Sequence, residues 1–273
     1  MKTAKEYRKQ AIETLRGNWK SGVISCLILG LIYAVFYAPS FISAQVAGES
    51  TTITYVLMVV TLVGMCFVFF PFYIANITAY LRKIRGSEHS ILEDTRDIFV
   101  NRFKRILEIG LFYFCTAICM AIVASILATA IVIAVFTATH GGLDISMLKT
   151  PESLAMITAT ICIAVIVLMI PVYIYYLAIS PAFWAHEDYT DSFYDLIKRS
   201  RYMMRGHKWQ LFCLYLSFIG WMFLGILTLG IGYLWLMPYT FASLAHFYED
   251  VRMEYEENVN ENENEDENEN ENV

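Results

Sequence analysis

The chain has 273 residues, of which 57 % are apolar by a wide count and 17 % are charged, and its mean hydropathy is +0.49. A soluble domain carries roughly a quarter charged residues, so this composition excludes an ordinary soluble enzyme. The net charge of −6 comes from the C-terminal end, because residues 249–271 hold 12 of the 26 acids. Residues 1–248 have 19 Lys and Arg against 14 acids. We therefore predict a membrane protein with no nucleic acid among its partners.

Long uncharged runs locate the membrane segments. A spanning helix needs about 20 mainly apolar residues, and five runs exceed that length, the last of them about twofold. The last run contains Gly230 and Gly232, which permit a tight reversal, so we divide it into two spans. The predicted fold is an all-α, polytopic membrane helix bundle with six transmembrane helices in three hairpins. In chain order, the predicted spans are 20–46, 52–81, 106–137, 154–184, 209–228 and 231–248.

A short segment with apolar residues at helical spacing precedes each hairpin. Two of these segments begin at a capping box, with Thr3 and Ser90 as the capping residues. Two end at a glycine, Gly17 or Gly206, the residue type that most often ends a helix in the left-handed conformation. Helices with one apolar face and one basic face lie in the headgroup layer of a membrane. We therefore predict amphipathic interfacial helices over about 3–17, 90–103 and 190–205.

The distribution of Lys and Arg indicates the orientation in the membrane. Residues 1–20, 82–105 and 198–208 carry 18 of the 20 basic residues, whereas the loops on the other side carry only Lys149. Both termini are therefore predicted to be cytoplasmic, in agreement with an even number of spans. One interpretation is that these charges only orient the chain; the other is that the chain binds anionic lipid headgroups, through Arg16, Lys20, Arg199, Arg201, Arg205 and Lys208.

The second helix of each hairpin contains a proline, namely Pro71, Pro171 and Pro238. A proline inside a spanning helix removes one backbone hydrogen bond and bends the helix. Similar residues follow the first two prolines, Phe-Tyr-Ile and Val-Tyr-Ile, and the third is followed by Tyr-Thr-Phe. We predict an internal repeat of three units, each with an interfacial helix, a straight span and a kinked span.

Neutral polar residues follow these prolines, and two interpretations of them are open. They bond backbone carbonyls that the prolines leave free, or they line a polar cavity between the kinked helices. The second interpretation carries an alternative function, a small transporter or channel for a neutral or amphiphilic solute. The residues are Asn76, Thr78, Ser180, Thr240 and Ser243.

Titratable residues end the fourth and sixth predicted spans. If the two groups meet, their histidines and carboxylates suit zinc or manganese, and a metal-dependent enzyme becomes a further hypothesis. The alternative is a set of polar side chains at the water boundary that pair with nearby arginines. We predict no metal and no cofactor, and no enzyme, because the chain lacks a nucleophile elbow, a phosphate-binding glycine loop and an HExxH pair. The two groups are His186, Glu187 and Asp188, and His246, Glu249 and Asp250.

The chain ends in a low-complexity acidic segment over residues 251–273. Such a segment buries too little apolar surface to offset the entropy of ordering, so it is predicted to be a disordered cytoplasmic tail. It is either a docking segment for a basic protein partner or a solvated extension.

Two stretches resemble a known family. They are IKRSRYMMRGHKWQLFCLYLSFIGWMFLGILTLGIGYLWLMPYTFASLAHFYED at 197–250 and the opening MKTAKEYRKQAIETLRGNWKSGV. Both resemble the bacterial integral-membrane family known as domain of unknown function 975, and the resemblance covers most of residues 1–250. It implies a multi-pass protein of the bacterial cytoplasmic membrane and brings no activity and no catalytic residues. The expected function is a non-catalytic structural, regulatory or partner- and lipid-binding element at the inner leaflet.

Overall fold

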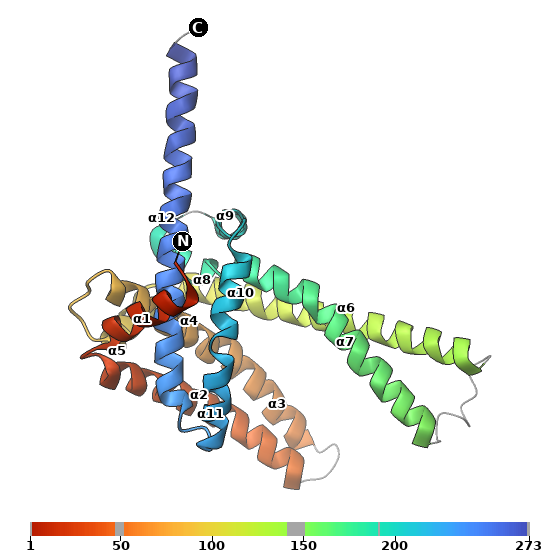
Figure 1. Ribbon diagram of the computed structural model, residues 1–273. Coiled ribbons are helices and arrows are strands. Elements are labelled where there is room, and N and C mark those ends of the chain that lie inside the picture. Colours follow the sequence, from red (N-terminus) through yellow and green to blue (C-terminus); the bar gives the residue numbers. More distant parts are fainter. Residues whose placement is uncertain (1, 47–51, 141–150, 191, 272–273) are drawn as a thin grey trace. The chain divides into compact units, whose positions relative to one another are not determined.

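The computed structural model describes residues 2–46, 52–140, 151–190 and 192–271. Every regular element within these residues is a helix, which confirms the all-α class (Figure 1). The elements are α1 (Ala4–Leu15), α2 (Trp19–Val46), α3 (Thr52–Gly64), the π-helix η1 (Met65–Phe69), α4 (Phe70–Ile84), α5 (Ile91–Asn101), α6 (Phe103–His140), α7 (Pro151–Ile179), α8 (Ala182–Asp188), α9 (Phe193–Met203), α10 (Lys208–Leu216), α11 (Ile219–Leu227) and α12 (Tyr233–Glu271).

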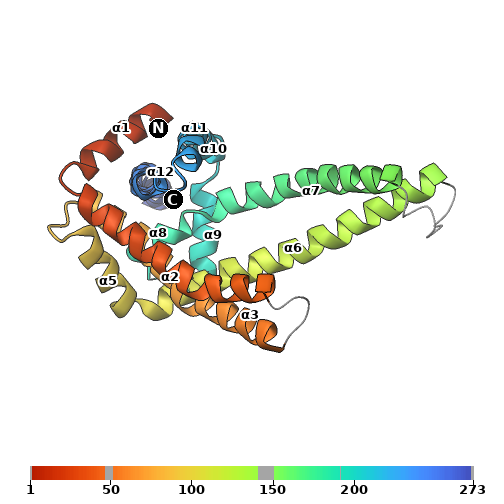
Figure 2. The ribbon, with the colours of Figure 1, turned by 90° about the horizontal axis from the view of Figure 1, so that it is seen from below.

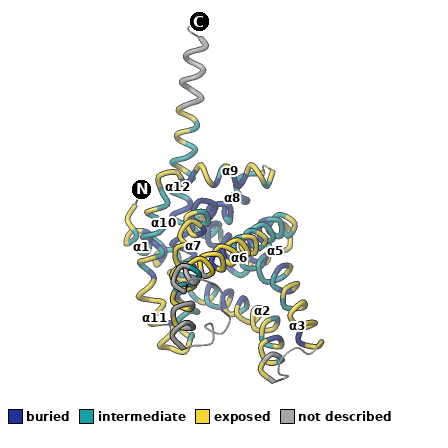
Figure 3. The backbone as a smooth tube through the Cα atoms, turned by 90° about the vertical axis from the view of Figure 1, so that its right-hand side faces the viewer, coloured by how far each residue is buried: buried dark blue, intermediate teal, exposed yellow. Residues whose placement is uncertain are grey.

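Five helical segments in the described residues are long and apolar enough to cross a membrane, judged by length and composition. Each agrees with one predicted span. Their apolar side chains are largely exposed within the chain, as expected where lipid is the surrounding solvent (Figure 3). The segments are Trp19–Ser43, Thr52–Ile84, Phe103–Ile131, Thr158–Asp188 and Lys208–Leu227.

The predicted sixth span, 231–248, is not among these five segments. It forms the first part of α12, whose apolar stretch is short and continues directly into acid-rich turns of the same helix. This stretch also contains polar residues, including Thr240 and His246. The structure therefore does not confirm six spans. This part of α12 contacts other helices of the chain and is less apolar than the five segments.

Two of the predicted spans are interrupted. α7 ends at Ile179, and Pro181 is the N-cap residue of α8, which begins at Ala182. The segment 208–227 is divided into α10 and α11 by a turn at Ser217 and Phe218. Proline cannot donate the backbone hydrogen bond that would continue α7, which explains the first interruption.

The three short helices lie within the predicted ranges. α1 and α5 each begin at the predicted capping box, in which Thr3 and Ser90 accept from the backbone of Glu6 and Glu93. α9 begins at Ser192, whose hydroxyl accepts from the backbone N–H of Asp195. Gly17 and Gly206 have φ angles of 84° and 86°, so the predicted left-handed residues after α1 and α9 are confirmed.

The chain forms two compact units. The first comprises residues 1–111 and 178–273, and the second comprises residues 112–177. The second unit consists of the longer parts of α6 and α7. Within it the rings of Tyr113 and Tyr176 stack with centroids 6.0 Å apart.

α12 is the central helix of the first unit, where it contacts α1, α2 and α4 (Figure 2). Ala242 and Ala245 are completely buried on α12, and their small side chains allow neighbouring helices to approach closely. Aromatic rings complete the packing around them, because Phe247 meets Tyr7 of α1 and Tyr248 stacks on Trp184 of α8 with ring centroids 5.6 and 5.8 Å apart.

α12 continues as a helix through Glu271, so the structure differs from the predicted disordered tail. Val251 is 1 % exposed, and Arg252 pairs with Glu249 and Glu256 one turn before and after it. Burial and pairing therefore extend the ordered helix beyond residue 250, where the sequence alone indicated only an excess of acids. The docking of a basic partner on this segment stays a prediction.

Replacement of Gly22 by Leu is expected to separate α2 from α12. A Cβ atom at Gly22 would lie 3.2 Å from the Pro238 side chain and 3.2 Å from the Tyr80 hydroxyl, so a larger side chain has no room. Overpacking of this kind costs about 1–3 kcal/mol. We expect a clearly lower thermal midpoint for Gly22→Leu in detergent. Gly30→Leu is the matched control on the same helix, since nothing lies within 4 Å of a Cβ there; equal midpoints for the two variants would contradict this packing.

Candidate functional site

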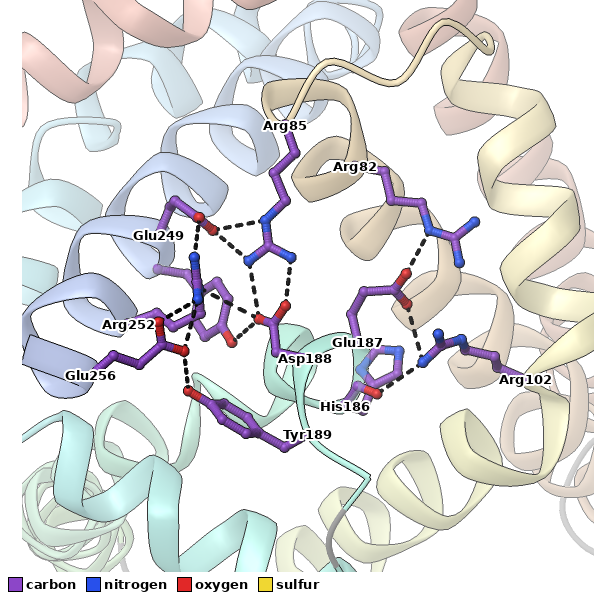
Figure 4. Close-up of polar contacts among 11 residues, drawn as sticks. Arg82, Arg85, Arg102, His186, Glu187, Asp188, Tyr189, Glu249, Arg252 and Glu256 are labelled. Atoms are coloured by element: carbon purple, nitrogen blue, oxygen red, sulfur yellow. Dashed lines mark hydrogen bonds and ion pairs between the residues drawn. The ribbon is translucent and has the colours of Figure 1, made fainter. Parts of the chain in front are cut away.

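The first unit contains a dense set of ion pairs where α4, α5, α8 and α12 end or leave the apolar region (Figure 4). We call it the arginine cluster. Each arginine contacts a carboxylate that belongs to another helix. Arg252 in addition pairs with two carboxylates of its own helix, α12. The cluster consists of Arg82, Arg85, Arg102 and Arg252 with Glu187, Asp188, Glu249 and Glu256.

Arg85 joins the two groups of carboxylates that the sequence singled out. Its guanidinium donates to both oxygens of Asp188, with Nη2 3.0 Å from Oδ2, and to Glu249 Oε2 at 2.6 Å. Burial opposes the charge on Arg85, but the hydrogen bonds that Arg85 donates to Asp188 and to Glu249 outweigh this effect and raise the pKa of Arg85 above its ordinary value. The ends of α8 and α12 are therefore connected through α4.

Arg82 makes the corresponding connection to α5. Its Nε donates to Glu187 at 2.7 Å and its Nη1 donates to Asp97 at 2.6 Å. The hydrogen bond from Arg82 is the main reason that the pKa of Asp97 is lowered. Arg102, at the end of α5, lies 3.5 Å from the other oxygen of Glu187. Glu187 is thus held between two arginines of neighbouring helices.

Tyrosine hydroxyls complete the cluster on the α12 side. The Tyr248 hydroxyl donates to Asp188 at 2.6 Å, and the Tyr189 hydroxyl donates to Glu256 at 2.9 Å. Burial, followed by the bond to Glu256, raises the pKa of Tyr189. Every carboxylate of the cluster thus has a cation or a hydroxyl as its partner, and the arrangement is suited to holding helices together.

The carboxylates of the two titratable groups do meet, and they meet through Arg85 and Arg252. Within the described residues, no three His, Cys, Asp or Glu side chains form a group that could hold a metal ion. His246 instead lies 2.8 Å from the Thr14 hydroxyl of α1, and Asp250 accepts from Tyr7 and Lys2. His186 is buried elsewhere. The alternative that the sequence left open, polar side chains that pair with nearby arginines, is therefore the one that the structure shows. Which arginines take part could not be read from the sequence, although Arg82 and Arg85 lie just after the predicted span 52–81.

Three of the five predicted cavity residues are completely enclosed. Asn76, Thr78 and Ser243 have 0 % exposure, so none of them borders a space that admits water in this structure. Asn76 instead accepts a hydrogen bond from Ser25 at 3.0 Å, which joins α4 to α2. Ser180 is buried in the turn between α7 and α8.

The predicted link between these hydroxyls and the prolines is wrong. The hydroxyls of Thr78, Thr240 and Ser243 donate to the carbonyls of residues 74, 236 and 239 on their own helices. In a regular α-helix the carbonyl that a proline leaves free lies four residues before it, which for Pro238 is that of residue 234, and the turn before Pro71 is the π-helix η1. Each hydroxyl therefore donates to the carbonyl four residues before it in its own helix, as is common for Ser and Thr in apolar helices.

The three prolines occupy different local settings. Pro71 lies in the first turn of α4, directly after the π-helix η1, whereas Pro171 and Pro238 lie inside α7 and α12. π-helical turns are frequent at helix bends. Pro171 belongs to the second unit and the other two to the first. The three-fold repeat and the transport path between the prolines stay predictions.

The predicted headgroup residues divide into two kinds. Arg16, Lys20 and Arg201 are exposed and form no ion pair with any described residue. Arg199 is half-buried, with its guanidinium 4.3 Å from the ring centre of Tyr189 and its Nη1 donating to Tyr255. Of the other two, Arg205 is exposed, with its guanidinium carbon 4.6 Å from the ring centre of Tyr202, and Lys208 is half-buried.

Replacement of Arg85 by Gln is expected to destabilise the first unit. It removes one of the two arginines that Asp188 and Glu249 share, and the side chains of these acids are only 14 % and 19 % exposed. Loss of charged hydrogen bonds of this kind costs about 1–3 kcal/mol. The measurement is the thermal midpoint of the purified protein in detergent, with Arg96→Gln, an exposed arginine of α5, as the matched control.

A double-mutant cycle distinguishes the bridge from a general charge effect. Glu249→Gln should be less damaging in the Arg85→Gln background than in the unmodified protein, because the pair is already broken. Additive effects of the two substitutions would show that Arg85 and Glu249 do not interact.

Comparison with known proteins places the chain in a family. The sequence model of the family described as Protein of unknown function (DUF975) matches residues 1–255. No curated protein and no solved structure matches the chain. Because the family match covers nearly the whole chain, including every residue of the arginine cluster except Glu256, the resemblance seen in the sequence is confirmed: this protein belongs to the DUF975 family, whose function is unknown.

Proposed function

We propose that this chain is a non-catalytic, multi-pass protein of the bacterial cytoplasmic membrane that binds anionic lipid headgroups at the inner leaflet. The observation that carries the proposal is how charge is divided at one end of the first unit. Carboxylates there are used in internal ion pairs, whereas several exposed cations on the neighbouring short helices have no partner among the described residues.

The carboxylates of the arginine cluster are all engaged. Glu187, Asp188, Glu249 and Glu256 contact arginines, and outside the cluster Asp250 accepts from Lys2 at 2.8 Å. These acids are therefore unavailable to neutralise the exposed Arg16, Lys20 and Arg201. A basic residue near an anionic membrane surface contributes about 1 kcal/mol of attraction, so a group of such residues favours anionic lipid.

The short helices support the same placement. α1 and α9 each bury one side, through residues such as Leu15 and Leu196, while Lys5, Lys9 and Arg201 are exposed. We assign them to the headgroup layer, as interfacial amphipathic helices. With α12 as a sixth span, both termini and the three basic segments lie on the cytoplasmic side, in line with the excess of Lys and Arg there.

The test is the lipid that accompanies the purified protein. We expect the full-length chain, extracted in a mild detergent, to be enriched in phosphatidylglycerol and cardiolipin relative to the bulk membrane. Removing four cations in one variant, Arg16→Gln, Lys20→Gln, Arg201→Gln and Arg205→Gln, should reduce that enrichment at least about tenfold, since together they contribute up to about 4 kcal/mol and about 1.4 kcal/mol corresponds to a factor of ten. Mass spectrometry of the extracted lipid gives the ratio.

The control is Lys149→Gln, a single basic residue that lies outside the described residues and that the charge count assigns to the opposite side. It should leave the lipid ratio unchanged. A lipid composition equal to that of the bulk membrane for the unmodified protein would contradict the proposal.

A further inference from the structure

A hollow of about 540 Å³ lies at the start of α6, within the first unit. We call it the α6 hollow. Arg102, Lys104, Arg105 and Glu108 line it from the end of α5 and the first turns of α6, and His186 and Tyr189 line it from α8 and the residue that follows. These residues come from two distant parts of the sequence. None of them is among the residues that the sequence predicted to bind lipid headgroups.

The hollow lies where two membrane segments reach the same boundary. One candidate span begins at Phe103 and another ends at Asp188, and the hollow is lined by residues on both sides of these limits. The ends of spanning helices lie at the depth of the lipid headgroups. The hollow is therefore at the level where lipid phosphates are found.

The charges in the hollow favour an anion. Three of its lining residues are cations and one, Glu108, is an acid. Arg102 uses only its Nη1 in contacts with Glu187 and with the carbonyl of His186, so its Nε and Nη2 make no hydrogen bond with any described residue. Lys104 is exposed and makes no ion pair within that part of the chain. These donors surround the first turn of a 38-residue helix, whose N-terminus also favours negative charge.

His186 is a second and independent sign of a ligand. Its side chain is 2 % exposed, and neither ring nitrogen makes a hydrogen bond. The carbonyl of Phe183 acts on the ring electrostatically but without hydrogen-bond geometry. A buried imidazole without partners costs free energy, because its N–H and its acceptor nitrogen have both lost water. Among the lining residues of the hollow it is the most deeply buried.

We infer that the α6 hollow is a binding site for a phosphate group, held by Arg102, Lys104 and Arg105, with His186 as a further lining residue. Guanidinium and ammonium groups with a helix N-terminus are the usual recognition elements for phosphate. The phosphate belongs to a lipid headgroup or is free inorganic phosphate, and the first case rests on the proposed lipid-binding function.

The experiment compares both sources with the full-length protein. One arm counts phosphatidic acid bound to the protein by native mass spectrometry, after titration from phosphatidylcholine nanodiscs that contain it. The other arm titrates inorganic phosphate against protein in detergent and follows the thermal midpoint. Binding in the first arm alone identifies a lipid phosphate, and a midpoint that rises with inorganic phosphate identifies a free one; each result supports the site.

The variant Lys104→Gln with Arg105→Gln should weaken binding about tenfold, because two charged donors are lost. Lys5→Gln with Lys9→Gln is the matched control, since it removes the same charge from exposed positions of α1. It should change the affinity of the hollow by less than about twofold. An equal loss in both double variants would overturn the site while leaving diffuse lipid binding, and therefore the proposed function, intact.

Glu108→Gln keeps the inference testable if the first variant does not fold. It removes the only acid among the described residues that line the hollow, so phosphate binding should tighten about threefold. A misfolded protein cannot produce that gain. Unchanged or weaker binding by Glu108→Gln, in a protein with an unchanged thermal midpoint, would overturn the inference, as would the absence of binding in both arms.

Discussion

The close packing of α12 against α1, α2 and α4 is the interaction on which the rest of the first unit depends. Helices in an apolar solvent gain little from burying more apolar surface, so they associate where small residues allow close contact. Ala242 and Ala245 on α12, and Gly22 on α2, provide that contact. The position of α12 then fixes where Glu249 and Arg252 emerge, and hence where the arginine cluster can form.

The arginine cluster fastens the helix ends at a favourable depth. Ion pairs deep in a membrane carry a large desolvation cost, whereas pairs at its edge keep partial access to water. Arginine suits this position, because its planar group can donate to carboxylates of two helices at once. Arg85 does so with Asp188 and Glu249, and Arg82 does so with Glu187 and Asp97. The carboxylates of the cluster are all paired within the protein, so they do not neutralise the exposed cations on the neighbouring short helices.

The same division of charge relates the proposed function to the α6 hollow. Arg102 takes part in both, since one of its nitrogens pairs with Glu187 while the others are directed to no described partner. A phosphate in the hollow would therefore be held by a residue that also touches the cluster. Recognition of lipid and cohesion of the helices would be coupled at this one residue.

Sequence by itself determined the helices, because the signals for them are local. Uncharged runs located the five apolar segments, and capping residues such as Ser90 located the short helices to within two or three residues. Only the tertiary structure decided which side chains meet. That Arg85 bridges Asp188 and Glu249, that the Thr78 hydroxyl also reaches the carbonyl of Phe183, and that His186 lines the same hollow as Lys104 depend on how helices distant in sequence pack. That packing is set by shape and depth in the membrane, and hydropathy and residue spacing along the chain do not encode it.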